Sequence, residues 1–255
     1  MKEFLGIDGY TRTPEGYFSW QHVTFVTSLM IVMTLLAVFI GRNRKHKSYA
    51  DKNKVLLWAA LLIDGFEIFK IAVCCIRNGS SGITHNLPLF LCSIQLITIP
   101  MAALCKGRLK EASLDFVMIF GILGALAGTY GAGQNYSCYP VLSMDNVVSG
   151  ITHAISGFAS LYIMFSGMIS MKKKNIWITF AILAGFCIAA YTANVLLDYN
   201  YMFLMRGDGT PYDVLFNLVG GHQILYPAGV VALFLLYISA YYGVTALVSR
   251  KKAKV

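Results

Sequence analysis

One cysteine and one histidine in this chain have the chemistry of an acyl-transfer site. Cys92 lies in the apolar run LPLFLCSI, and His153 lies in a later stretch of small and polar residues at spacings of three and four. A thiolate is a strong nucleophile, and an imidazole within hydrogen-bond reach lets it form where burial alone would keep the thiol protonated. The thioester that forms on attack of an ester can pass its acyl group to a hydroxyl or to water. Many apolar chains contain a Cys and a His, so the assignment depends on the elements that position these two.

The composition of the chain requires that those elements lie in a membrane. Of its 255 residues, 57% are hydrophobic and 13% charged, and the mean hydropathy is +0.62. A water-facing surface needs about twice that share of charge, which excludes a soluble globular domain and a disordered scaffold. The apolar excess must face lipid.

Seven apolar segments are long enough to be read as membrane helices. The fourth contains Gly121, Gly124 and Gly128, a small-residue spacing that predicts a close-packing seam with a neighbouring helix. The predicted spans are Ser19–Ile40, Val55–Ile76, Leu87–Leu104, Ala112–Tyr130, Val147–Met171, Ile176–Leu197 and Ile224–Val248.

The basic residues predict how these spans are oriented. Sixteen of the 21 Lys and Arg residues fall in the loops after the first, third, fifth and seventh segments, and such loops stay in the cytoplasm. The sequence therefore predicts an all-α, polytopic membrane protein: a seven-transmembrane-helix bundle with its N terminus outside and its C terminus cytoplasmic. It is expected to form a single domain over residues 1–255, with an outer segment (1–18) and a basic tail (249–255). The basic loops are explained by topology and anionic lipid, so no nucleic-acid partner is expected.

This topology gathers polar residues in the outer half of the bundle. Glu67 and Lys70 lie one turn apart on the second helix, and Pro88, Cys92, Gln95 and Ile99 share one face of a third helix. His153 enters with the fifth helix at nearly the depth of Cys92. Polar groups inside spans usually face a protein interior or a wet cavity, and we expect a polar cavity open to the outer leaflet. Its other predicted members, at the outer helix ends, are Asn194, Asp198 and His222.

Each polar residue also has a purely structural explanation. In this explanation Glu67 and Lys70 only neutralise one another, and Asp64 is a buried acid bonded to a backbone carbonyl. A lone cysteine in a membrane helix is usually a small hydrophobe. His22 and His222 are then interfacial residues.

Four stretches of the sequence carry a resemblance to a known family. LPLFLCSI resembles the signature of the YwaF-like integral membrane family, which includes the eukaryotic transmembrane acyltransferase of ether phospholipid synthesis. The other three stretches are similar to later segments of the proteins of this family, and the region from the first stretch to the last (87–237) is about three-fifths of the chain, with the four in the expected order. They are ITHAISGFASLYIMF (151–165), NVLLDYNYMFLMRGDGTPYDVLF (194–216) and GGHQILYPAGVVALFLLY (220–237).

The resemblance implies a seven-span lipid acyltransferase that forms an acyl-enzyme on Cys92, with His153 as general base. Asn194, Gln95 or Lys70 would donate hydrogen bonds to the oxyanion, while Glu67 would either orient the histidine or pair with Lys70. Membrane phospholipids or related esters are the expected substrates, without cofactor or metal, and a bacterial plasma membrane is the expected location. In one departure, this chain has Phe90 where many bacterial relatives carry histidine.

Two other function classes remain open from the residues alone. A metal-dependent lipid hydrolase would take ligands from among its histidines and carboxylates, although no His pair stands at a local ligand spacing. A transporter or lipid-binding protein would use the charged residues of the second helix. The metal ligands would come from His22, His85, His153, His222, Asp198 and Glu67, and the transport residues would be Asp64, Glu67 and Lys70.

Overall fold

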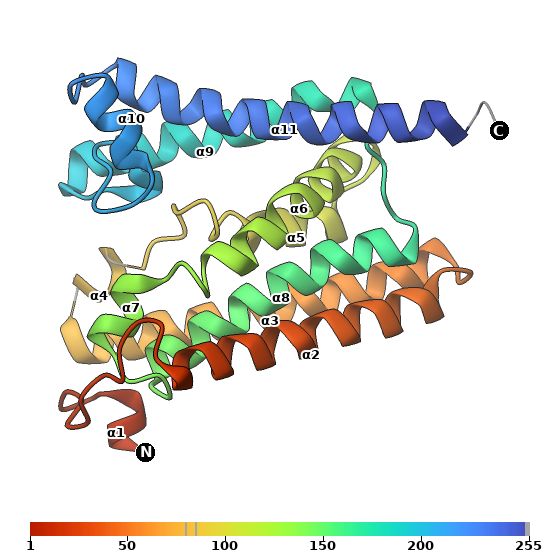
Figure 1. Cartoon of the computed structure of the whole chain (residues 1–255). Helices are drawn as coiled ribbons and strands as arrows, with labels where there is room; N and C mark the ends of the chain where they lie inside the picture. Colours follow the sequence, from red (N-terminus) through yellow and green to blue (C-terminus); the bar gives the residue numbers. More distant parts are fainter. Residues whose placement is uncertain (80, 85, 253–255) are drawn as a thin grey trace. The chain divides into compact units, whose positions relative to one another are not determined.

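The computed structural model describes residues 1–79, 81–84 and 86–252, and it is built of helices (Figure 1). Within these residues the only extended pairing is an isolated bridge between Ile7 and Gly9. In chain order the elements are α1 (Lys2–Leu5), α2 (Trp20–Arg44), α3 (Tyr49–Asn78), α4 (Ser81–Thr84), α5 (Gln95–Leu104), α6 (Gly107–Ala127), α7 (Gly133–Cys138), α8 (Met144–Ser166), η1 (Lys173–Asn175), α9 (Ile176–Leu197), η2 (Tyr201–Phe203), α10 (Tyr212–Leu218) and α11 (Leu225–Lys252).

Four stretches are long and apolar enough to cross a bilayer, and they confirm a multi-pass, all-helical membrane protein. By contrast, α5 has only ten residues and α3 is interrupted by charges, so the count of seven spans stays a prediction. The four candidate spans are Trp20–Arg44, Met144–Ser166, Lys173–Leu197 and Leu225–Val248.

Six of the seven predicted segments match a helix to within six residues at each end, but the third was predicted wrongly. Its helix begins at Gln95 instead of Leu87, and Cys92 lies in a turn. The N–H groups of Ser93 and Ile94 both bond to the carbonyl of Phe90 in this turn. Pro88 accounts for the absence of helix at Leu87, because a proline lacks an N–H donor and disfavours helical geometry at the preceding residue. Pro88 and Cys92 therefore do not share a helix face with Gln95 and Ile99.

Serine side chains fix where three of the long helices begin. Ser19 accepts a hydrogen bond from the N–H of His22 at the start of α2, and Ser48 and Ser143 do the same at the starts of α3 and α8. Each satisfies one of the N–H groups that a helix start leaves unpaired. At its other end, α8 stops at Gly167, which adopts the left-handed conformation that glycine tolerates best. Local chemistry thus sets these boundaries.

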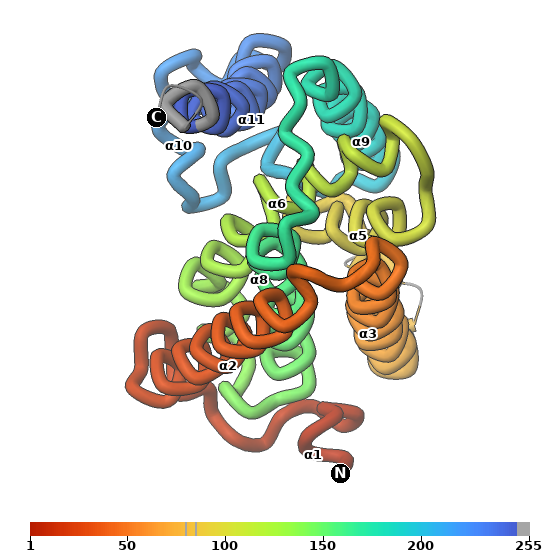
Figure 2. Tube along the Cα trace, turned by 90° about the vertical axis from the view of Figure 1, so that its right-hand side faces the viewer, coloured from red at the N-terminus to blue at the C-terminus, as the bar shows by residue number. Residues whose placement is uncertain are grey.

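The chain divides into two compact units. The first comprises Met1–Leu87 and Gln95–Ile169, and the second comprises Pro88–Ile94 and Ser170–Val255. In the first unit, α8 packs against α2, α3 and α6, and Figure 2 shows it flanked by α2 and α3. Its core joins Ile63 of α3, Ile99 of α5 and Tyr162 of α8, among others. This core fixes the positions of any functional side chains on α3, α5 and α8.

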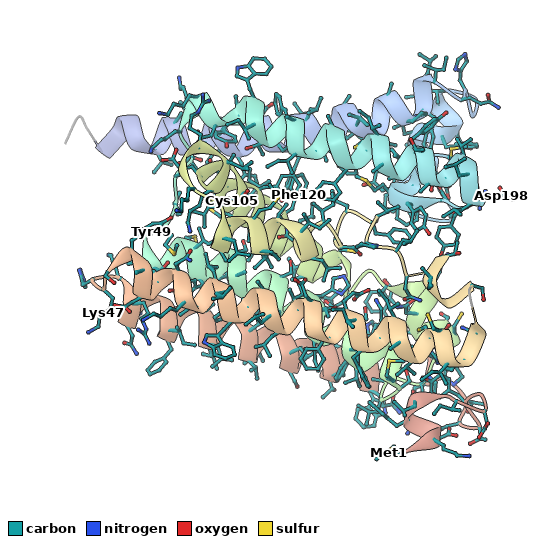
Figure 3. All side chains as sticks on the ribbon, turned by 180° about the vertical axis from the view of Figure 1, so that it is seen from behind. Met1, Lys47, Tyr49, Cys105, Phe120 and Asp198 are labelled. Atoms are coloured by element: carbon teal, nitrogen blue, oxygen red, sulfur yellow. The ribbon has the colours of Figure 1, made fainter. Side chains whose placement is uncertain are left out.

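The connections of the first unit lie at its two ends. Met1 lies at one end, and Lys47, Tyr49 and Cys105 lie at the other (Figure 3). The basic connections after α2 and after α5 are therefore at the same end, opposite the N terminus. This arrangement is the one that alternating basic loops require, and the orientation in the membrane stays a prediction.

In the second unit, α9 and α11 run side by side (Figure 1). The hydroxyl groups of Thr179 and Tyr242 are 2.9 Å apart and tie the two helices near one end. Toward the other end, the Tyr226 hydroxyl donates to the carbonyl of Phe203 at 2.7 Å. The segment between the helices contains η2 and α10, and the turn carrying Cys92 belongs to this unit.

Candidate functional site

The structure divides the eight predicted site residues between the two units. The first unit contains Glu67, Lys70, Gln95 and His153, whereas the second contains Cys92, Asn194, Asp198 and His222. The pairing of Cys92 with His153 therefore stays a prediction.

The hydrogen bonds of His153 determine which of its ring nitrogens is basic. Its Nδ1 lies 2.7 Å from the carbonyl oxygen of Ser149, one turn earlier on α8. A carbonyl oxygen can only accept, so Nδ1 carries a hydrogen and donates it. In the neutral ring, Nε2 is then the nitrogen that accepts a proton. The ring is held in the tautomer that a general base acting through Nε2 requires.

Gly128 at the end of α6 makes room for this imidazole. A Cβ atom at Gly128 would lie 1.9 Å from both Nε2 and Cδ2 of His153. About two turns deeper, a Cβ at Gly121 would meet the Ser156 carbonyl of α8 at 2.7 Å. The predicted glycine seam is confirmed at these two positions, and it has a function besides packing, because it leaves space for the histidine ring.

Glu67 and Lys70 of α3 form an ion pair with an Oε1–Nζ distance of 2.6 Å, and their side chains are 9% and 18% exposed. A second ion pair, between Arg77 of α3 and Asp145 of α8, gives a common reference point for positions along these two helices. Inward from that pair, Glu67 is ten residues along α3 and His153 is eight along α8. At 1.5 Å per residue these are about 15 Å and about 12 Å, so the acid and the imidazole lie at nearly the same level.

Gln95, the first residue of α5, presents an amide without a full set of partners. Its side chain is fully buried, and its Oε1 accepts from the Thr98 hydroxyl at 3.1 Å. Its Nε2 has no hydrogen-bond partner among the described residues, nor does the buried Oδ1 of Asp64 on the adjacent α3. Leaving such a group unpaired in an apolar interior costs about 1–3 kcal/mol. Gln95 therefore has a donor available for a bound molecule.

In the second unit, the turn carrying Cys92 is anchored by an aromatic residue two positions earlier. The ring of Phe90 packs against Tyr201, with centroids 5.4 Å apart, and against Phe203 and Tyr199 at 6.1 and 6.3 Å. Burial raises the pKa of Tyr199, with a contribution from Asp208, so its phenol remains neutral. Phe90 therefore serves as an apolar anchor for the turn that carries Cys92.

The loop that receives Phe90 is shaped by two asparagines. Asn194 is buried, and its amide accepts from the N–H of Tyr201 at 2.6 Å and donates to the carbonyl of the same residue at 3.0 Å. Asn200 bonds in the same way to Met205 and Arg206. These bonds offset the strain of the left-handed φ angles of Met202 and Phe203. Both polar atoms of Asn194 are thus engaged in holding the loop.

The two remaining predicted residues lie at helix ends of the second unit. Asp198 is exposed and follows the last residue of α9 with a φ of 51°. His222 is also exposed, and its Nδ1 accepts from the N–H groups of Ile224 and Leu225 at the start of α11. His222 therefore caps a helix.

His22 is a structural residue. It is fully buried in the first unit. Its Nδ1 accepts from the N–H of Phe18 at 3.1 Å, its Nε2 donates to the carbonyl of Thr129 at 3.2 Å, and its ring packs on Tyr136 at 3.9 Å. Both ring nitrogens are thereby engaged in tying the chain before α2 to the end of α6.

Sequence analysis missed a buried charged cluster, which we call the Arg77 clamp, made of Arg77, Asp145 and Tyr10. Arg77 donates two hydrogen bonds to Asp145, at 2.6 and 2.8 Å, and the Tyr10 hydroxyl donates to the same carboxylate at 2.5 Å. Burial and this bond raise the pKa of Tyr10. The clamp fastens the N-terminal segment to α3 and α8. The sequence did contain a signal for this cluster, because Arg77 and Asp145 carry opposite charges at the outer ends of two predicted spans.

Among the described residues, no group of three His, Cys, Asp or Glu side chains is arranged to hold a metal ion. His85, one of the ligands considered for a metal site, lies outside the described residues.

Comparison with known proteins supports a membrane protein family. No curated protein and no solved structure matches the chain. The profile of one family matches residues 17–242, which include every helix from α2 to α10 and most of α11. This protein is a member of the TMEM164 family of membrane proteins.

Proposed function

We propose that the protein is a membrane-bound lipid acyltransferase in which Cys92 is the nucleophile and His153 the general base. It moves a fatty acyl group from a phospholipid or related ester to a lipid hydroxyl. The observation that carries the proposal is the bond from His153 Nδ1 to the Ser149 carbonyl, which leaves Nε2 as the proton acceptor. The likeness of LPLFLCSI and of the histidine-bearing helix to YwaF-like proteins and their ether-lipid acyltransferase supports the same assignment.

The reaction has two balanced halves. His153 Nε2 takes the Cys92 proton, the thiolate attacks the ester carbonyl, a C–S bond forms and the ester C–O bond breaks. The departing lysolipid oxygen receives the proton from the imidazolium. An acceptor hydroxyl then gives its proton to Nε2 as its oxygen attacks the thioester, the C–S bond breaks, and the leaving sulfur takes the proton back from the imidazolium. With water as the acceptor, the same steps give hydrolysis.

Gln95 is the best candidate for stabilising the oxyanion. Its Nε2 is buried and lacks a partner among the described residues, so it can donate without breaking an existing bond. Removing one such donor from an acyl-transfer site typically costs a factor of about 10²–10³ in rate. Lys70 is paired with Glu67 and Asn194 with Tyr201, and Glu67 contributes charge at the level of the imidazole.

The proposal includes the arrangement in the membrane. The chain forms one membrane domain of seven spans, with the N terminus outside, the C terminus cytoplasmic, and the active site open to the outer leaflet of a bacterial plasma membrane. The separation of Met1 from Lys47 and Cys105 at opposite ends of the first unit supports it (Figure 3).

Paired substitutions test the chemistry. Cys92→Ala and His153→Gln should abolish acyl transfer, and an acyl thioester should be found on Cys92 of the wild type by mass spectrometry. Cys105→Ala and His46→Gln are matched controls in other loops and should keep full turnover. Lipid products distinguish transfer, which forms a new ester, from hydrolysis, which releases free fatty acid. Full turnover in either site variant, with normal folded yield, contradicts the assignment.

A further inference from the structure

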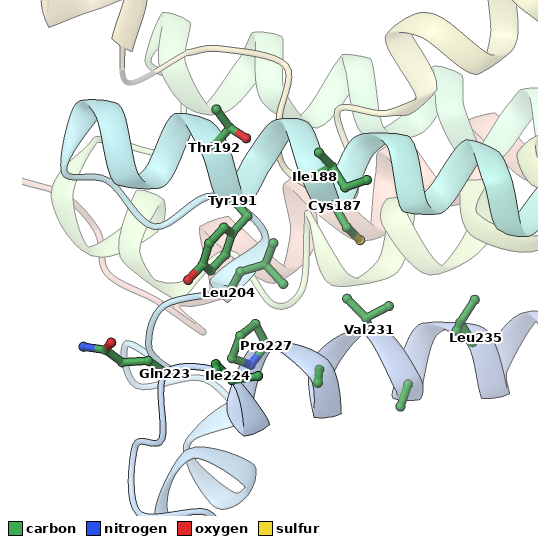
Figure 4. Close-up of a pocket in the computed structure, with 12 residues that line it drawn as sticks. Cys187, Ile188, Tyr191, Thr192, Leu204, Gln223, Ile224, Pro227, Val231 and Leu235 are labelled. Carbon is green, nitrogen blue, oxygen red and sulfur yellow. The ribbon is translucent and has the colours of Figure 1, made fainter.

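The second unit contains an apolar groove between α9 and α11, with a volume of about 590 Å³ (Figure 4). Cys187 and Tyr191 line it from α9, and Pro227, Val231 and Leu235 line it from α11. Leu204 of the connecting loop also lines it. The Thr179–Tyr242 hydrogen bond ties the two helices beyond the Leu235 end of the groove, and the Tyr226–Phe203 bond ties α11 to the connecting loop at the other end. These bonds hold the walls of the groove in place, as in preformed ligand sites.

Small residues keep this groove open. On α11 the lining includes Ala228 and Ala232, where many membrane helices would carry leucine. Alanine side chains leave space between the helices that larger side chains would fill.

The lining changes in character along its length. Gln223 and the Tyr191 hydroxyl lie at the end where α9 finishes and α11 begins, and the lining toward Val231 and Leu235 is apolar (Figure 4). A molecule that matches this lining has one polar end and a long hydrocarbon part.

The length of the groove matches one leaflet of a bilayer. Its lining extends from Ile224, just before α11, to Leu235 within α11, and these eleven residue steps cover about 16 Å. The hydrocarbon core is about 30 Å thick, so a phospholipid acyl chain fills about 15 Å of it.

The polar end of the groove is continuous with the turn that carries Cys92. Leu204 lines the groove, and its neighbour Phe203 packs on Phe90 with ring centroids 6.1 Å apart. Phe90 is two residues before Cys92.

From these observations we infer that the groove between α9 and α11 binds an acyl chain of a phospholipid, with its ester at the Gln223 end. The assignment of this lipid as the substrate rests on the acyl transfer proposed for Cys92, whereas the binding itself does not.

The test uses full-length protein in nanodiscs and a phosphatidylcholine with a diazirine in one acyl chain. Photolabel should concentrate on α9 and α11 peptides that contain Cys187, Tyr191 or Val231. Ala232→Phe fills the groove and should lower this labelling about tenfold, the effect of an ordinary steric clash. Ala240→Phe makes the same change on α11 outside the groove and should leave labelling unchanged.

The outcomes separate this inference from the proposed function. Labelling spread evenly over all apolar helices, or unaffected by Ala232→Phe, overturns the inference even where Cys92→Ala abolishes turnover. Groove labelling that persists in Cys92→Ala supports the inference even where that variant keeps turnover, and in that case only the acyl-transfer proposal fails. Stronger labelling by a diazirine fatty acid than by the phospholipid overturns the identity of the ligand.

Discussion

Arg77 and Asp145 are largely buried, with side chains 9% and 12% exposed, and two hydrogen bonds join the guanidinium to the carboxylate. The geometry is bidentate, which suits the planar guanidinium. Removing one partner leaves an uncompensated charge in an apolar place. This loss is larger than the net contribution of the pair, because the intact pair has already lost its hydration.

Arg77→Met should therefore lower the free energy of unfolding by about 3–5 kcal/mol. The double variant Arg77→Met with Asp145→Leu should lose less, because no charge is stranded. Chemical unfolding in detergent micelles measures both. The exposed pair Lys2–Asp8, with side chains 80% and 74% exposed, is the control, and Asp8→Asn should change stability by less than about 1 kcal/mol. Equal losses in the single and double variants would contradict this account.

The sequence predicted the chemical character of the candidate side chains better than it predicted their hydrogen-bond partners. The Glu67–Lys70 pair followed from its spacing of three, because such residues are neighbours on any helix. The tautomer of His153 follows from a carbonyl one turn away, and the engagement of Asn194 follows from loop geometry at Tyr201. Backbone contacts of this kind leave no pattern of residue types, so sequence analysis could not find them.

At the scale of elements, the contact between α6 and α8 sets the space available to the imidazole. Glycine lies where α6 meets His153, so the backbone of α6 itself forms one wall of that space. The helix seam and the candidate base are therefore coupled.

Gly128→Ala should lower the acyl-transfer rate about 100-fold, since a shift of about 1 Å in a reacting group has that effect. The added Cβ would lie 1.9 Å from Nε2 and must displace the ring. Gly65→Ala is the matched control, because a Cβ there meets nothing within 4 Å, and alanine favours a helix over glycine. Initial rates at equal folded yield provide the measurement. A rate within twofold of wild type for Gly128→Ala would place the imidazole outside the reaction.

The boundaries of helices were predictable where the composition changes sharply. The prediction failed where the helix is interrupted within a continuous apolar run. Ile176–Leu197 was predicted to the residue. The error in the third segment arose because hydropathy continues from Leu87 to Leu104 while the helix does not start until Gln95. Pro88 was visible in the sequence, but an apolar run contains no signal for how many residues the turn after a proline occupies.

At the scale of the whole molecule, the alternation of basic loops makes the orientation testable. In a Cys138→Ala background, which removes the exposed native cysteine, Asp8→Cys should react with a membrane-impermeant maleimide in intact cells. Lys47→Cys should react only after permeabilisation, because basic loops remain in the cytoplasm. Reaction of both cysteines in intact cells would contradict the proposed topology.

The Arg77 clamp has a consequence for biosynthesis. Tyr10 and Asp145 are 135 residues apart, so the ribosome has completed more than half of the protein before the second partner emerges. During that interval the Tyr10 hydroxyl has no Asp145 carboxylate to bond to, so the N-terminal segment remains undocked. The N-terminal segment can dock only after α8 has packed against α3. Protection of residues 1–16 from added protease would therefore report how far assembly has progressed.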